Sequence, residues 1–431
     1  MVEKKFHGWK ILIASTILAI LGAGLGLMET GLYMGPVVED LGFTIGGFSW
    51  TFAMGGVGMA LGMWLFSKLF NKSNFKLILL MLAIVIFFTF MGYSIANQLW
   101  QFIALQTILG FVLAGLVNMP INIMITNWFT HKRGTFIALA YAGIGIGGVI
   151  FTPLVTYFIN ELGWRMSYRI TGIAIAVVVI PLILFVFKMS PEEVGQKAYT
   201  KPESEANKDK PVRKAKDNLE FDGVSLAVAK KTPAYWLSGL VLFIWGVVMA
   251  GTLNHVPTYL IAVGIVPMVM ATILSVNKLF MLIATASAGY LADTIGVSKV
   301  VNIASFCFGT GTLVLLFAEN ITFSWAFSVL FGIAQMAYNM APPLIATLLF
   351  GKKDFVKVTG FFGAMFAIGT LMGPLITGFL FDTTGNYILA WWFYGILGLI
   401  SILLMSLAIK SNKSIFDTYR DTPTETVSAV Q

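Results

Sequence analysis

One cation lies far from both ends of a long apolar segment. Lys278 stands near the middle of the apolar run 268–292. A charged side chain at such a depth in a bilayer costs a few kcal/mol or more, so it usually faces a cavity and has a purpose. A lysine ammonium group is a compact point charge that can meet a carboxylate. We therefore predict that Lys278 binds an organic anion; the alternative is that it neutralises a structural acid.

Two further groups in apolar runs are candidates for carrying a proton. Glu29 lies in the run 10–35, and a carboxyl group in a low-dielectric site can exchange protons near neutral pH. Glu29 is predicted to carry a proton or to pair with a cation, unless it reaches the outer membrane interface. His255 lies 226 residues later, and histidine titrates close to physiological pH. For His255, proton coupling, ligand binding and a purely structural role all remain open.

Neutral polar side chains gather where prolines interrupt two apolar runs. Such stretches are tolerated in a membrane where they line a cavity or pack on protein. They occur around Pro120 and around the pair Pro342 and Pro343. The predicted ligand contacts are nearby amides and phenols, with aromatic packing as the alternative for the tyrosines: Asn118, Asn122, Tyr141, Asn254, Tyr338 and Asn339.

The composition places these residues in membrane-spanning helices. Of the 431 residues, 58% are hydrophobic and 11% are charged, whereas a soluble domain has about 25% charged residues. Apolar runs long enough to cross about 30 Å of hydrocarbon recur along the whole chain. They predict an all-α membrane protein with twelve transmembrane helices near 10–35, 48–70, 76–96, 100–127, 134–158, 167–188, 235–263, 268–292, 298–318, 322–349, 357–381 and 388–409.

Signals of other protein classes are weak. Gly143-x-Gly145-x-x-Gly148 matches a dinucleotide fingerprint, but no strand precedes it, and small residues inside an apolar run allow helices to approach closely. The single cysteine, Cys307, excludes an internal disulfide framework. No His, Cys or Glu cluster has metal-ligand spacing, and no nucleophile–base pair stands out. We expect no cofactor, no metal and no enzymatic activity.

The charges predict the topology. All 28 Lys and Arg residues except Arg165, Arg169 and Lys278 lie in segments on the same side of the predicted spans as the N-terminus. This asymmetry follows the positive-inside rule, so both termini are expected in the cytoplasm and the protein in the plasma membrane. The lipid bilayer is therefore the expected partner, and the net charge of +8 requires no nucleic acid.

The two halves of the chain repeat each other. A shift of 221 residues maps Phe129 onto Phe350 and Gly148 onto Gly369. The polar stretch between the halves reads as a cytoplasmic linker with one short amphipathic helix at 219–230. The expected organisation is a six-helix half at 1–189, a linker at 190–233, a six-helix half at 234–410 and a tail at 411–431. Substrate sites of such duplicated carriers lie near the midplane between the halves.

Several motifs carry a family resemblance. Phe6-x-Gly8-Trp9, the segment Trp128 to Gly134 and Gly163-Trp164-Arg165 resemble monocarboxylate transporters and the related oxalate/formate antiporters of the major facilitator superfamily. The segment Gly289 to Lys299, with Asp293, is similar to the loop motif of the whole superfamily. The resemblance implies the major facilitator fold. Arg133 and Asp293 are either ordinary cytoplasmic charges or gating residues that favour one access state.

These residues lead to one preferred function and two alternatives. The preferred one is secondary transport of a small organic anion, expected to be a monocarboxylate, by proton symport or by exchange for a counter-anion. The first alternative is efflux of an amphipathic or cationic compound, because an acid such as Glu29 attracts cations. The second is a membrane receptor that binds its ligand without transport. The sign of the ligand charge separates the first two, and flux separates the third.

Overall fold

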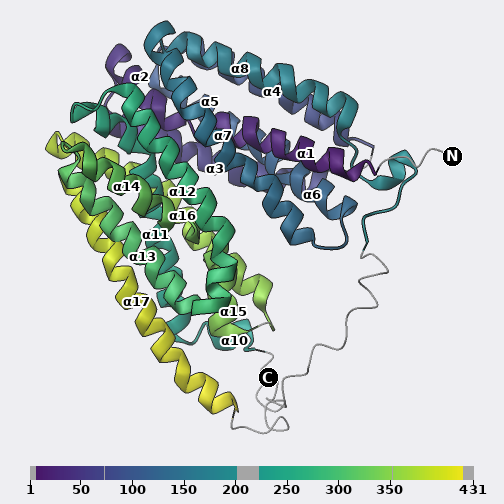
Figure 1. The fold of residues 1–431 in the computed structure, drawn as a ribbon, viewed down its shortest axis with the longest axis vertical. Coiled ribbons are helices and arrows are strands. Elements are labelled where there is room, and N and C mark those ends of the chain that lie inside the picture. Colours follow the sequence, from purple (N-terminus) through teal and green to yellow (C-terminus); the bar gives the residue numbers. More distant parts are fainter. Residues whose placement is uncertain (1–5, 72, 201–222, 352, 421–431) are drawn as a thin grey trace. The chain divides into compact units, whose positions relative to one another are not determined.

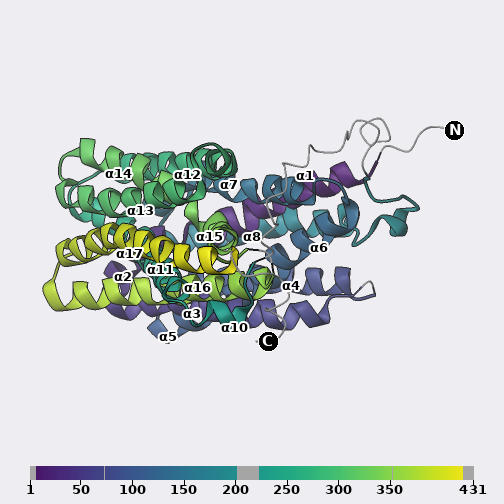
Figure 2. The same ribbon diagram turned by 90° about the horizontal axis from the view of Figure 1, so that it is seen from below.

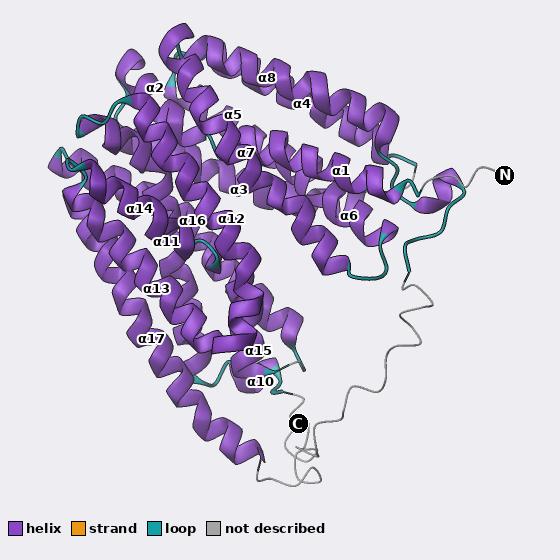
Figure 3. Cartoon of the chain, in the orientation of Figure 1, coloured by secondary structure: helices purple, strands orange, loops and turns teal. Residues whose placement is uncertain are grey.

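The chain folds almost entirely into helices. The computed structural model describes residues 6–71, 73–200, 223–351 and 353–420, and their side chains except at 337–341 and 413–420. These residues form helices and connecting loops, with two isolated backbone bridges and no strand among them (Figure 3). The predicted all-α membrane fold is therefore confirmed for the described part of the chain.

The first six predicted spans are present, and two of them are irregular. The first comprises α1 (Gly8–Leu18), a π-helical segment (Ala19–Leu25), a 3-10 turn (Thr30–Tyr33) and α2 (Met34–Leu41). The fourth comprises α5 (Leu99–Leu113), a π-helical segment (Ala114–Asn118) and α6 (Met119–Trp128). The others are α3 (Ile45–Leu69), α4 (Phe75–Ile95), α7 (Arg133–Leu162) and α8 (Trp164–Pro181), the last extended by a π-helical segment (Leu182–Val186).

The last six predicted spans are also present. Eleven spans of the described chain are long and apolar enough to cross a membrane, and the tenth predicted span is divided at Gln335–Met336. Pro342 and Pro343 each lack a backbone donor, which weakens helical continuity there, but the break precedes them. The helices are α11 (Pro233–Ala262), α12 (Pro267–Ile295), α13 (Val297–Leu313), α14 (Ile321–Ala334), α15 (Ala337–Phe350), α16 (Phe355–Thr384) and α17 (Ile388–Arg420).

Small residues allow the spans to touch at the level of the backbone. Gly24 of the first span and Gly147 of α7 lie so close that a Cβ atom at either would overlap the other. Close approach of this kind replaces hydrophobic burial as the packing force inside a membrane. Elsewhere α4 packs along α8, and α13 packs along α17 (Figures 1 and 2).

The chain divides into two compact units that do not follow its two halves. The first unit holds the described residues of Met1–Lys208 together with Leu253–Leu282 and Pro374–Tyr387. The second holds those of Asp209–Thr252, Ile283–Gly373 and Ile388–Gln431. We call the span ends at the loops 42–44, 96–98, 163, 263–266 and 385–387 the distal ends. The domain boundaries expected from the sequence stay a prediction.

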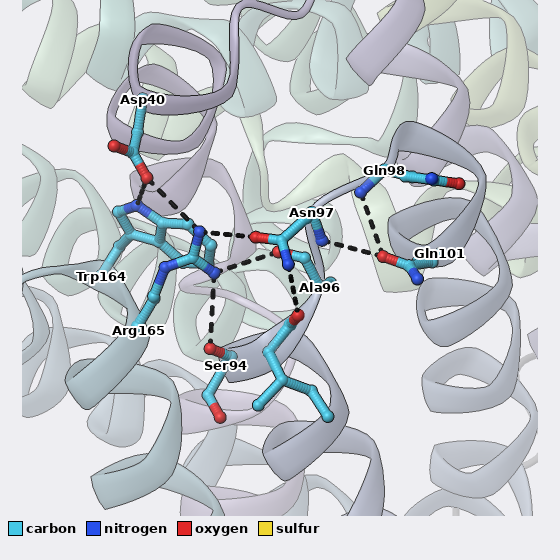
Figure 4. A network of polar contacts seen from close by, with 9 residues as sticks. Asp40, Ser94, Ala96, Asn97, Gln98, Gln101, Trp164 and Arg165 are labelled. Atoms are coloured by element: carbon cyan, nitrogen blue, oxygen red, sulfur yellow. Dashed lines mark hydrogen bonds and ion pairs between the residues drawn. The ribbon is translucent and has the colours of Figure 1, made fainter.

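A polar network ties three distal ends of the first unit together (Figure 4). The Arg165 guanidinium donates to Ala96 O at 3.1 Å and to Asn97 Oδ1 at 2.9 Å, and lies 3.6 Å from the Asp40 carboxylate. It also stacks on the Trp164 ring, whose Nε1–H donates to Asp40. The planar guanidinium suits several acceptors at once. The Gly163-Trp164-Arg165 motif thus joins α8 to the ends of α2 and α4.

The start of the linker docks on the loop between α6 and α7. The Tyr199 backbone donates to Trp128 O at 2.8 Å and accepts from the Thr130 N–H at 2.9 Å. The Tyr199 ring also contacts Phe6 and Trp9. Two motifs that carried the family resemblance, Phe6-x-Gly8-Trp9 and Trp128 to Gly134, therefore meet in one aromatic cluster with the linker.

The end of the linker docks on the repeat-equivalent loop between α15 and α16. The Val224 N–H donates to Phe350 O at 2.9 Å, and the Asp354 carboxylate accepts from the Leu226 N–H at 2.8 Å. Of the helix expected at 219–230, the described part contains α10 (Leu226–Ala229), and 219–222 lie outside the described residues.

Beyond the expected end of the last span, α17 continues to Arg420, and Asn412 Nδ2 donates to Leu349 O.

The Asp354 contact is expected to survive mild acid. The Leu226 N–H and then Lys357 hold the pKa of the Asp354 carboxyl below its ordinary value of 3.8. Because the pKa is lower in the folded protein, the Asp354 contact stabilises the docked linker fully at pH values above 3.8. This contribution is lost as the pH falls below 3.8 and through the lowered pKa. Hydrogen exchange at the Leu226 amide, corrected for intrinsic rates, should stay slow from pH 7 to 5. It should quicken below pH 3.8 and in Asp354→Asn, while the Val224 amide remains protected; equal loss at both amides would contradict this.

Candidate functional site

The first span is not helical where Glu29 lies. Between its π-helical segment and its 3-10 turn, residues 26–29 form a turn. Glu29 caps the 3-10 turn with φ −94° and ψ −1°, and its side chain is 1% exposed. Irregular backbone at membrane depth is tolerated where it is enclosed by protein or lines a water-filled cavity. The break therefore brings a carboxylate into the interior of the first unit.

Helix α7 provides a smooth face opposite this carboxylate. Gly147 contacts the first span at Gly24, and a Cβ atom at Gly148 would overlap the aliphatic stem of Lys278. One turn further, Thr152 is fully buried and its hydroxyl lies 3.1 Å from Glu29 Oε1 and 2.6 Å from Gly148 O. Gly147 thus lets α7 approach the first span, and Gly148 lets the stem of Lys278 pack against another side of α7.

Helix α12 brings Lys278 into contact with both groups. The Lys278 Nζ donates to Glu29 Oε1 at 2.6 Å and to Thr152 Oγ1 at 2.6 Å. The lysine side chain is 13% exposed and the glutamate side chain 1%. All three residues belong to the same compact unit. Lys278, Glu29 and Thr152 therefore form a buried charge triad, which we call the charge triad below.

The hydrogen bonds of the charge triad leave one acceptor open. Thr152 has a single hydroxyl proton, so it donates either to Glu29 Oε1 or to Gly148 O while it accepts from Lys278. Glu29 Oε2 is buried and has no hydrogen-bond partner within the described part of the chain. An ion pair removed from water needs its remaining lone pairs satisfied. The glutamate therefore keeps an oxygen that can take a proton or a ligand donor.

Three predicted residues form a second polar cluster between the fourth span and α7. Asn122 Nδ2 donates to the Tyr141 hydroxyl at 3.2 Å, and that hydroxyl donates to Asn118 O at 3.2 Å. Asn118 ends the π-helical segment of the fourth span. Tyr141, Gly148 and Thr152 recur at spacings of seven and four, so they share one face of α7. The second cluster thus lies along the helix face that holds part of the charge triad.

The other predicted residues lie elsewhere. His255 is fully buried, and its Nε2 lies 3.3 Å from Ser49 Oγ and 3.2 Å from Pro374 O. The neighbouring Asn254 is half-buried, and its backbone packs against Gly31. Tyr338 and Asn339 are in α15, where the side chains are not described.

The two predicted gating residues are both exposed. Arg133 Nε donates to Phe129 O at 3.0 Å within its own loop. Asp293 is in the last two turns of α12. Arg133 and Asp293 belong to different compact units, so a gating contact between them stays a prediction.

Thr152 and Gly148 were not among the predicted site residues. A threonine in an apolar span does not by itself indicate a functional site, because its hydroxyl usually donates a hydrogen bond to a carbonyl of its own helix. A weak signal was present, because Thr152 follows Gly148 by one turn on the face that carries Tyr141. Among the described residues no three His, Cys, Asp or Glu side chains gather in a way that could hold a metal ion.

Comparison with known proteins assigns the family. The profile of the Major Facilitator Superfamily matches residues 12–287 and 263–428. The chain belongs to the Major Facilitator Superfamily. Its family and its helical fold indicate a membrane transporter rather than an enzyme.

Individual relatives of this superfamily member are distant. It is 26% identical to monocarboxylate transporter 12-B of Danio rerio over 73% of this chain and 68% of that protein. It is 24% identical to the oxalate:formate antiporter of Oxalobacter formigenes, over 85% of this chain and 83% of that protein. The match to the MFS-type transporter hasB of Aspergillus fumigatus, at 24% identity, covers 68% of this chain but only 64% of that protein.

A solved structure agrees with this fold. The nucleoside transporter NupG superposes with a TM-score of 0.68 at 13% identity, and the match covers 94% of this chain and 98% of that one. An identity this low establishes the arrangement of the helices and leaves the ligand open.

Proposed function

We propose that the protein is a secondary active transporter of a small organic anion, expected to be a monocarboxylate, in the plasma membrane with both termini in the cytoplasm. The observation that carries the proposal is the charge triad, in which Lys278 Nζ lies 2.6 Å from Glu29 Oε1 at a break in the first span. Ionisable residues inside membrane spans usually serve ion or substrate pathways. The names of two relatives, a monocarboxylate transporter and an oxalate:formate antiporter, support an anionic substrate.

The triad offers a way to couple an anion to a proton. Without substrate, Lys278 is neutralised by Glu29. A substrate carboxylate that binds Lys278 has to replace this internal carboxylate. Two negative charges beside one ammonium group are unfavourable in a low-dielectric site, where Coulomb energies are far larger than in water. Glu29 therefore takes up a proton as the anion binds, and Thr152 keeps a hydrogen bond to whichever partner remains.

The same logic describes exchange. While Glu29 stays protonated, Lys278 is free of its internal partner and binds one anion at a time. An incoming anion can then replace an outgoing one without transfer of a proton. The amides and phenol of the second cluster, Asn118, Asn122 and Tyr141, supply neutral contacts for the rest of the substrate. Proton symport and anion exchange thus use the same residues and differ in the fate of Glu29.

One observation favours a second candidate function. Glu29 Oε2 has no hydrogen-bond partner within the described residues, so an amine or another cation can bind the glutamate. Efflux of a cationic or amphipathic compound would use this oxygen, with Lys278 displaced. A receptor without transport would bind either class of ligand and give no flux.

Ligand-induced thermal stabilisation tests the proposal. Purified protein should be stabilised by lactate, formate or oxalate and not by tetraphenylphosphonium. Lys278→Gln should lose the anion effect, as should the double variant Glu29→Gln with Lys278→Gln, in which no charge is left unpaired. Lys299→Gln, an exposed lysine on α13, is the control and should respond like the wild type. Equal anion stabilisation in the double variant would refute the site, and stabilisation by the cation alone would favour efflux.

A further inference from the structure

The first turn of α3 receives a carboxylate from the far end of the sequence. The Gly46 N–H donates to Asp382 Oδ1 at 3.0 Å, while Thr44 caps the same helix by accepting from the Gly47 N–H at 2.9 Å. The first N–H groups of a helix have no partner within it, and the helix dipole favours a negative charge there. Asp382 of α16 thus lies at the N-terminus of α3, where the helix dipole favours an acid.

A buried hydrogen bond lies one turn below this contact. His255 Nε2 faces Ser49 Oγ of α3 and the Pro374 carbonyl of α16. The Ser49 hydroxyl donates to Ile45 O at 2.8 Å, and a carbonyl can only accept, so Nε2 must carry the proton and donate to both. His255 and Ser49 are 0% exposed. The histidine of α11 therefore joins α3 to α16.

Two glycines, Gly46 of α3 and Gly378 of α16, let these helices pack closely at the junction. A Cβ atom at Gly378 would overlap Ser49 and Gly46, and one at Gly46 would overlap Asp382. Helices that meet through glycine can separate without withdrawing long side chains from one another. The Asp382 side chain is exposed to solvent, so water can replace its hydrogen bond when the helices part. The junction is therefore both specific and easily reversible.

We infer that Asp382, Gly46, Ser49, His255, Pro374 and Gly378 form a distal latch, which holds α3 against α11 and α16 and has to open when the protein admits or releases substrate on the distal side. All six residues belong to the same compact unit, and Asp382, Gly46, Ser49 and Gly378 lie within the last two turns at the distal ends of α16 and α3. The helices come from both halves of the sequence, whose rearrangement alternating access requires. The inference rests on the proposed transport function, but the latch itself does not depend on which substrate binds.

The latch predicts a defined role for each contact. Asp382 and the α3 N-terminus supply the electrostatic attraction. His255 fixes the register of three helices, and Gly46 with Gly378 permits their close approach. Loss of the Asp382 charge or an added methyl group at Gly378 should therefore have the same effect by different means. Both changes should favour the state in which the distal side is open, since they act only while the helices touch.

Cysteine labelling of purified protein tests the latch without substrate. The reporter is Thr258→Cys in a Cys307→Ala background; Thr258 is half-buried on α11 and packs against Gly35. Asp382→Asn and Gly378→Ala should each raise the rate of maleimide modification by about fivefold or more, which is within the usual range of conformational coupling. Glu39→Gln, an exposed acid at the distal end of α2, should leave the rate unchanged.

The outcomes separate the latch from the function. Unchanged labelling in both Asp382→Asn and Gly378→Ala, with melting temperatures like that of the parent, would overturn the latch. If Gly378→Ala fails to fold, Asp382→Asn alone decides the matter. Faster labelling in a protein that binds no anion would keep the latch and reject the proposed substrate class. A normal anion response with unchanged labelling would do the reverse.

Discussion

Lys278→Ala should lower the melting temperature of the empty protein, and a second substitution, Glu29→Gln, should restore most of the loss. Among the described residues the lysine is the charged partner of the buried Glu29 carboxylate, at 2.6 Å. Removal of one member of a buried ion pair typically costs about 3–5 kcal/mol, whereas replacement of both members is often neutral. Differential scanning fluorimetry of the wild type, both single variants and the double variant measures the coupling directly.

An ion pair with an exposed lysine provides the control. Asp354 Oδ1 and Lys357 Nζ lie 3.0 Å apart, and the Lys357 side chain is 66% exposed, so water and salt screen the pair and its contribution is small. Lys357→Ala should therefore leave the melting temperature nearly unchanged. The charge triad would be wrong if Lys278→Ala were as stable as the wild type, or if the double variant were less stable than both single variants.

The second large effect is expected for Glu29→Gln in transport. Glutamine has no proton to exchange, so accumulation of the anion driven by a pH gradient should be lost. Exchange of anion for anion should persist, since Lys278 remains and can still bind a carboxylate. Apparent anion affinity should increase by about tenfold or more, because an opposite charge near an ionised group shifts its equilibria by roughly one to three logarithmic units. Reconstituted protein in proteoliposomes, with and without a pH gradient, gives both measurements.

An exposed acid on one of the helices of the charge triad controls this experiment. Glu161 is exposed at the distal end of α7 and lies outside the charge triad. Glu161→Gln should keep both proton-driven accumulation and exchange. Unchanged proton-driven accumulation in Glu29→Gln would assign this carboxylate to structure, and loss of exchange as well as accumulation would mean that Glu29 contacts the substrate itself.

Much of the fold could be predicted because it depends on local properties. The length of each apolar run determines where a helix crosses the membrane. Most observed spans begin and end within a few residues of those expected, although the first span continues to Leu41 and α17 to Arg420. The tenth span was expected to be irregular near Pro342 and Pro343, and the break occurs at Gln335–Met336. The polar stretch between the halves was expected to be a linker with one short helix, yet Tyr199, Val224 and Leu226 bond to backbone and side chains of two loops. Composition alone does not reveal such docking.

Proton coupling was predicted for both Glu29 and His255, which lie 226 residues apart, and these roles stay predictions. The structure places Glu29 in the charge triad and His255 in the contact between α3, α11 and α16. The partners of each side chain come from neighbouring helices, which the sequence of its own span does not specify.

The sequence by itself determined the membrane-spanning helices, their order and the short set of ionisable residues buried within them, because hydropathy and charge act on each segment alone. Only the tertiary structure decided that Lys278 and Glu29, 249 residues apart, meet in one ion pair with Thr152. That choice depends on backbone contacts such as those of Gly147 with Gly24 and Gly148 with Lys278. A glycine allows close contact with any neighbouring helix, so the residue type alone does not predict which helix will pack against it. The packing of the whole unit selects that helix.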